Sequence, residues 1–188
     1  LAALRRNTVL DKIIMVITTA FVSMPSFIMG SFLLIVFSVK LGWVPANGAT
    51  AEGLILPIIT LALYPMSYIT RLTRSSMLDV LGQDYIRTAR AKGLKEKVVI
   101  YSHAWRNALL PIITSIIGWF ISIFSGSLII EQMFALNGMG QLYYQGLMNN
   151  DFELALAIQM FYVLIALVGQ LITDLSYGIV DPRVRVNK

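Results

Sequence analysis

The chain of 188 residues is 57% hydrophobic and only 13% charged, whereas soluble globular domains average about 45–50% apolar and about 25% charged residues. This composition excludes an ordinary water-soluble domain and predicts a membrane protein. Cysteine is absent, which excludes disulfides and thiolate metal sites. The net charge of +5 does not indicate a nucleic-acid partner, because the basic residues lie mostly in three clusters along an apolar chain.

Four uncharged stretches meet or approach the roughly 20 apolar residues that a membrane-spanning helix needs. We therefore predict an all-α, polytopic membrane helix bundle that forms a single transmembrane domain over residues 1–188. The four predicted spans are 13–39, 53–70, 107–130 and 154–173.

The first predicted span, 13–39, is longer than a perpendicular crossing requires, so we expect it to tilt or bend. Pro25 lies in its middle and frees a backbone carbonyl, which neighbouring helices or hydroxyl side chains must satisfy. Small residues, among them Ser26 and Gly30, surround the proline. Two interpretations remain open, a kink that allows close helix packing and a bend that lines a pathway.

The other three predicted spans depend on neighbouring helices. The second contains Pro57 and Pro65 and is short, and the fourth contains Gln159 and Gln170, which we expect to find partners across the bundle. None of the four holds an ionisable side chain in its core. This argues against a proton- or ion-coupled secondary transporter, which usually holds such groups at membrane depth.

The distribution of Lys and Arg predicts the orientation of the chain. Loops 41–52 and 131–153 contain neither residue, so the positive-inside rule places both outside the cytoplasm and the basic hairpin 71–109 and the C-terminus inside. In the second loop Tyr143 and Tyr144 fit an interfacial aromatic belt. The alternative is that this loop forms a cap or docking surface for an extracytoplasmic partner.

The charged hairpin 71–109 is predicted to contain two helices. Residues Gln83 to Lys92 favour a short helix, and Gly93 supplies its C-cap. A basic tip could serve only topology or contact anionic lipid, but a helix–glycine–helix unit of this length predicts a rigid handle for a cytoplasmic partner. The second helix is predicted from one apolar stripe formed by Val98, Tyr101, Trp105 and Ala108.

The ordered segments DYIRTARAKGL, HAWRNALLPIIT, EQMFALNGMGQL and DPRVR resemble the permease subunits of bacterial ATP-binding-cassette (ABC) importers. The resemblance is to the dipeptide, oligopeptide and nickel subfamily, most of all the B-type oligopeptide permease. It implies a type I, MetI-like permease in the bacterial cytoplasmic membrane, with sequence upstream of Leu1 and about six spans in the full protein.

In that family the cytoplasmic hairpin is the EAA loop, whose short coupling helix docks into a groove of the ATP-hydrolysing subunit. Only Ala89 and Gly93 match the wider Glu-Ala-Ala, three residues, Gly pattern, and both are small enough to permit close approach to that subunit. The resemblance assigns ATPase coupling to Asp84, Tyr85, Arg87, Thr88, Ala89, Arg90, Ala91, Lys92 and Gly93.

The chain contains no Gly-x4-Gly-Lys-Ser/Thr phosphate loop, so we expect no catalytic residue or cofactor here and assign ATP and Mg²⁺ to partner subunits. His103 is the only histidine, and we expect no metal centre. The implied partners are a second homologous permease, two ABC ATPase subunits, an extracytoplasmic peptide-binding protein and membrane lipid. The alternatives are a dipeptide or nickel permease, a secondary transporter or channel, and a membrane scaffold.

Overall fold

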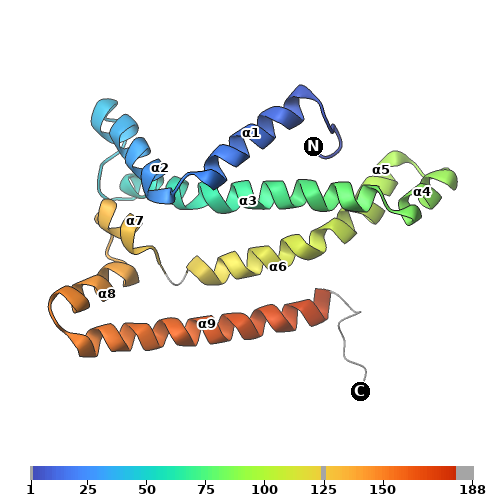
Figure 1. The fold of residues 1–188 in the computed structure, drawn as a ribbon. Helices are drawn as coiled ribbons and strands as arrows, with labels where there is room; N and C mark the ends of the chain where they lie inside the picture. Colours follow the sequence, from blue (N-terminus) through green and yellow to red (C-terminus); the bar gives the residue numbers. More distant parts are fainter. Residues whose placement is uncertain (1, 124–125, 181–188) are drawn as a thin grey trace, which may run out of the picture.

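The computed structural model describes residues 2–123 and 126–180, and all the regular elements in these two ranges are helical (Figure 1). Four helices lie side by side as a slab, each contacting the next. The hairpin of α4 (Asp84–Ala91) and α5 (Glu96–Val98) lies at one end of the slab, and α7 (Leu128–Met133) and α8 (Met139–Met148) lie at the other. In their order across the slab the four are α1 (Val9–Ser23), α3 (Ile55–Leu81), α6 (Arg106–Ile123) and α9 (Phe152–Val180).

The first predicted span is broken at its proline. After α1 the chain is extended at Met24 and Pro25, and α2 (Ser26–Leu33) leaves at an angle of 103°. Proline carries no backbone N–H and disfavours a helical residue before it, so the α1 hydrogen bonds stop there. The π-helix η1 (Leu34–Lys40) completes the segment. The expected kink is therefore a full break between two helices.

The other predicted spans differ in length from the helices. The second predicted span continues as one helix to Leu81, because no glycine or proline follows Pro65 until Gly82. The third predicted span corresponds to α6, which ends at Ile123 instead of residue 130. The fourth corresponds to α9, which extends beyond residue 173 to Val180. By length and composition, the described residues supply two helices able to span a membrane, or three if the bent pair counts as one, against the four predicted.

The predicted outer loop is largely helical. It contains the end of α7 (Leu128–Met133) and all of α8 (Met139–Met148), and α8 packs on α9. Gln170, which we expected to bond across the bundle, donates to Asp174 one turn further along α9, with Nε2 to Oδ1 at 3.0 Å.

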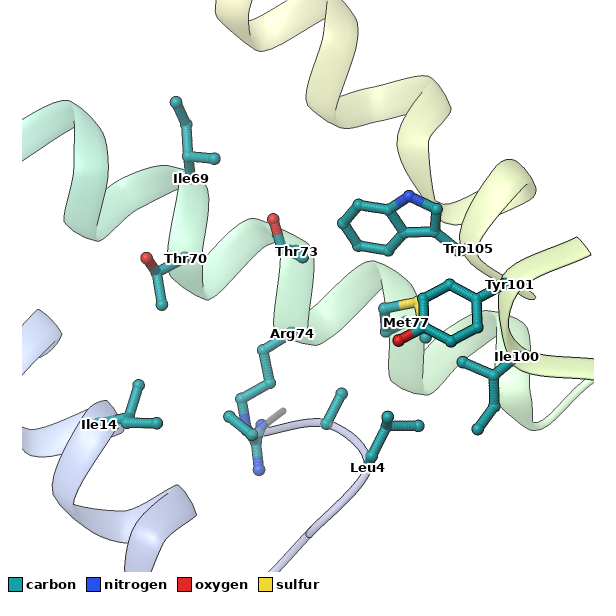
Figure 2. Close-up of a pocket in the computed structure, with 12 residues that line it drawn as sticks. Leu4, Ile14, Ile69, Thr70, Thr73, Arg74, Met77, Ile100, Tyr101 and Trp105 are labelled. Carbon is teal, nitrogen blue, oxygen red and sulfur yellow. The ribbon is translucent and has the colours of Figure 1, made fainter. Parts of the chain in front are cut away.

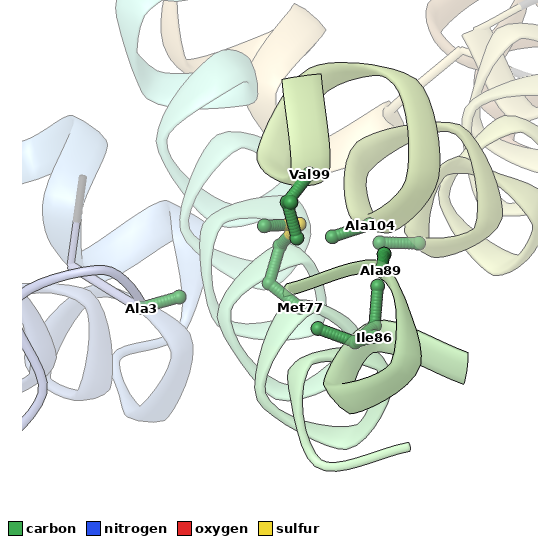
Figure 3. Close-up of a cluster of buried hydrophobic side chains, with 7 residues drawn as sticks. Ala3, Met77, Ile86, Ala89, Val99 and Ala104 are labelled. Atoms are coloured by element: carbon green, nitrogen blue, oxygen red, sulfur yellow. The ribbon is translucent and has the colours of Figure 1, made fainter. Parts of the chain in front are cut away.

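Two clusters of buried apolar side chains lie at the two ends of the slab. Leu56, Ile130 and Phe134 form one cluster where α3 meets α7. The second cluster lies beneath the hairpin (Figure 3) and contains Ala3, Met77, Ile86, Ala89, Val99, Ala104 and Ala108. Between them large apolar side chains are exposed along α1, α3 and α9, as expected of surfaces that contact lipid or another subunit.

Candidate coupling site

The predicted coupling residues form one short helix and the turn after it. Helix α4 (Asp84–Ala91) lies within the predicted range, with Gln83 and Lys92 as its two cap residues. Gly93 has φ +75°, the left-handed conformation that glycine adopts without strain. The chain then reverses into α5 (Glu96–Val98) and the π-helix η3 (Val99–Trp105).

One apolar side of helix α4 packs against the rest of the protein. Ile86 is fully buried and Ala89 is 6% exposed, and both pack in the cluster that contains Met77 of α3 and Val99 and Ala104 of η3 (Figure 3). Burying an isoleucine side chain contributes about 1.5–3 kcal/mol. Ala89 therefore faces the protein's own core.

Of the predicted apolar stripe in the second half of the hairpin, only Ala108 is buried, whereas Val98 is 40%, Tyr101 68% and Trp105 37% exposed. The other buried residues there are Val99 and Ala104, which were not predicted. The π-helix explains the difference, because its hydrogen bonds join residues five apart. Val99 and Ala104 are five apart and so face the same side, a spacing that a search for α-helical periodicity overlooks.

The remaining predicted coupling residues form the exposed side of α4 and the turn. Arg90 pairs with Glu96, with Nη2 to Oε1 at 2.7 Å, and thereby braces α4 against α5. The same hydrogen bonds raise the pKa of Arg90 and lower the pKa of Glu96, so both groups are charged at neutral pH. The exposed set is Asp84, Tyr85, Arg87, Thr88, Arg90, Ala91, Lys92 and Gly93.

A cavity of about 420 Å³ lies behind the hairpin, where α3, η3 and the N-terminal segment meet (Figure 2). Leu4, Thr73 and Met77 line it, together with the exposed rings of Tyr101 and Trp105. Arg74 also borders this cavity. The hairpin therefore contacts the start of the chain as well as α3.

Arg74 forms an ion pair with Asp11, and sequence reasoning missed it. The distance from Nε to Oδ1 is 2.6 Å, and Asp11 is buried between α1 and α3. Both residues lie outside the predicted spans, and their separation of 63 positions gives no local pattern. The ion pair joins α1 to the part of α3 that carries the hairpin.

Within residues 2–123 and 126–180 no three His, Asp or Glu side chains gather as a metal site. Helix α4 carries charged side chains on its exposed side, and its buried side packs on α3 and η3. A displacement of α4 therefore moves both of these helices.

The family described as "binding-protein-dependent transport system inner membrane component" matches residues 1–186. The chain is 42% identical to the dipeptide transport system permease protein DppB of Bacillus subtilis, over 100% of this chain and 61% of that protein. It is 41% identical to the oligopeptide transport system permease protein OppB of Haemophilus influenzae and 37% identical to that of Escherichia coli, in each case over 98% of this chain and 61% of the relative. The chain thus spans less than two thirds of the length of these relatives.

Proposed function

Because the chain belongs to the binding-protein-dependent transport system inner membrane component family, we propose that it is the permease part of an ATP-driven importer of oligopeptides. It forms half of a translocation path in the bacterial cytoplasmic membrane and catalyses no reaction itself. Its coupling helix α4 receives movement from an ATPase subunit and passes it to the spans.

The observation that carries this proposal is the two-sided character of α4. Ile86 and Ala89 fix one side to α3 and η3, while Tyr85, Arg87 and Thr88 remain exposed on the other. A helix anchored in this way moves as one body with α3, since the packed contacts between them resist deformation. A basic helix that only set the orientation of the protein in the membrane would not need a buried side packed against α3 and η3.

The proposed assembly contains two permeases, two ATPase subunits that hold ATP and Mg²⁺, and a peptide-binding protein. The hairpin end of the slab faces the cytoplasm and contacts the ATPase. The opposite end, with α7 and α8, receives the binding protein. Membrane lipid covers the remaining apolar surface.

A dipeptide importer is the second candidate, because one relative at 42% identity is named a dipeptide permease. Both candidates share the coupling helix and differ in the length of the transported peptide. Uptake of labelled peptides of increasing length by the complete transporter distinguishes them.

The coupling role is tested by cross-linking, since the chain contains no native cysteine. Thr88→Cys on the exposed side of α4 is expected to capture an ABC ATPase in membranes of the source cell. Met148→Cys, 61% exposed at the opposite end of the slab, is the matched control and should not capture it. Capture of lipid alone at Thr88→Cys, or of the ATPase equally at both positions, contradicts the proposal.

A further inference from the structure

Helix α3 lies between α1 and α2 on one side and α6 on the other, which leaves two of its faces uncovered (Figure 1). At 100° per residue these faces point in nearly opposite directions. One carries exposed aliphatic side chains, among them Ile55, Ile59 and Met66, and suits contact with lipid. The other carries Leu61, Tyr64, Pro65, Tyr68, Arg71, Leu72 and Ser75.

This second face borders two neighbouring cavities. The first, about 470 Å³, lies at the break between α1 and α2 and is lined by Pro25, Tyr64 and Trp119. The next, about 460 Å³, is lined by Tyr68 and Arg71. Val22 borders both cavities, so they follow one another along α3. We call this surface the α3 groove.

Aromatic rings line the groove near the helix break. Tyr64 and Tyr68, one helical turn apart, both pack edge-on against Trp119 of α6, with ring centroids 5.4 and 6.3 Å away. Their exposed fractions are 37% and 40%, so each ring keeps a surface open to the groove. Such rings attract apolar side chains and ammonium groups alike.

Arg71 supplies a positive charge at the hairpin end of the groove. Its Nη1 donates to Thr19 Oγ1 at 3.0 Å, and no salt bridge to a carboxylate is recorded for it in the described part of the chain. Arg74, three residues further on, is instead neutralised by Asp11. The distance along the axis from Tyr64 to Arg71 is about 10 Å at 1.5 Å per residue, which is about three residues of extended peptide.

We infer that the α3 groove is the surface along which a peptide passes, with Arg71 binding its terminal carboxylate and Tyr64, Tyr68 and Trp119 contacting its side chains and amino terminus. This inference rests on the proposed function and adds the residues that touch the substrate. A guanidinium and a carboxylate form charge-assisted, bidentate hydrogen bonds, which suit this end of a peptide. The break at Pro25 lies at the end of the groove away from Arg71.

The first test measures the contribution of Arg71 to recognition of the carboxylate. The complete transporter, in proteoliposomes with its ATPase and binding protein, takes up either a neutral tripeptide or the same tripeptide amidated at its C-terminus. Arg71→Gln is expected to lower the uptake of the free acid relative to the amide about tenfold, the size of one lost hydrogen bond to a charged group. Arg71→Lys, which keeps the charge, should retain part of the preference. An unchanged ratio, or equal loss for both peptides, overturns the role of Arg71.

The second test locates the peptide on the helix. Leu72→Cys in the groove and Lys95→Cys, exposed in the turn between α4 and α5, are labelled by a water-soluble thiol reagent during turnover, with and without excess tripeptide. Peptide is expected to slow labelling of Leu72→Cys and to leave labelling of Lys95→Cys unchanged. Equal protection at both positions contradicts the groove. So does a Leu72→Cys that reacts only after the second permease is removed, because the groove is then an interface between subunits.

The two proposals fail in different ways. If Thr88→Cys captures the ATPase and wild-type transporter takes up peptide, negative results at Arg71 and Leu72 refute only the groove. If the wild type takes up no peptide and Thr88→Cys captures no ATPase, the importer proposal fails and the groove proposal fails with it.

Discussion

The guanidinium of Arg74 binds both carboxylate oxygens of Asp11, with Nε to Oδ1 at 2.6 Å and Nη2 to Oδ2 at 2.7 Å. Asp11 is 2% exposed and also accepts the backbone N–H of Asn7 at 3.0 Å. The pair fixes the start of α1 to the half of α3 that carries the hairpin. Any rocking of α3 therefore moves α1 with it.

Arg74→Gln is expected to lower the melting temperature of the detergent-solubilised transporter, because it leaves the Asp11 carboxylate buried without its cation. Arg71→Gln, the same change one turn earlier on α3, should lower it less, since Arg71 donates to the neutral hydroxyl of Thr19. Asp11→Asn combined with Arg74→Gln should recover part of the loss, as expected of residues that interact directly. Equal losses for the two arginine variants would contradict the structural role of the pair.

Ile86 and Tyr85 are neighbours on α4 with opposite exposures, 0% and 44%. Ile86→Ala removes the side chain that anchors α4 and is expected to cost about 2–5 kcal/mol of local stability. Tyr85→Ala should cost less than about 0.5 kcal/mol and leave the helix folded. Hydrogen exchange of the α4 amides measures both effects. Faster exchange in Tyr85→Ala than in Ile86→Ala would refute this orientation of the helix.

The left-handed turn at Gly93 gives a conformational prediction. A Cβ at this position meets no atom within 4 Å, so Gly93→Ala is expected to cost about 1–2 kcal/mol for the positive φ alone. Gly93→Asn should cost less, because asparagine tolerates this conformation. Gly82→Ala is the matched control, since Gly82 has φ −81°. Thr88→Cys cross-linking to the ATPase should fall in Gly93→Ala and persist in Gly82→Ala, and the reverse order would contradict the argument.

Glu131 is buried between α7 and α8, where its carboxylate accepts backbone N–H groups from Ser127 at 3.1 Å and Gln141 at 2.8 Å. A Cβ added at Gly138 would collide with this carboxylate, although the φ of −109° suits any residue. Gly138→Ala and Glu131→Ala are therefore both expected to destabilise the α7–α8 segment by about 1–3 kcal/mol, because the same buried donors lose their acceptor.

The α7–α8 segment is tested by comparing the stability lost in the double variant Gly138→Ala and Glu131→Ala with the losses in the two single variants. The double variant should lose about as much thermal stability as either single variant, because both changes remove one interaction. Gly118→Ala, where an added Cβ meets nothing within 4 Å, is the matched glycine control. Full additivity of Gly138→Ala and Glu131→Ala would show that the two positions act independently.

Several features were predictable because they depend on local chemistry. An apolar composition predicts an all-α membrane protein, since backbone polar groups in lipid must bond within their own segment. Gly93 marks the end of α4 because few residues other than glycine adopt a positive φ. Pro25 marks the break before α2 because proline cannot donate a helical hydrogen bond.

The sequence by itself thus determined the class of the protein, the short helix at Asp84–Ala91 and the glycine turn after it. Only the tertiary structure decided that Ala89 faces inward, that η3 moves the buried positions to Val99 and Ala104, and that Asp11 meets Arg74. A helix or turn is encoded by residues within a few positions of each other. Which side of α4 is covered, and which charges pair, depends on segments far apart in the chain that meet only when the bundle packs.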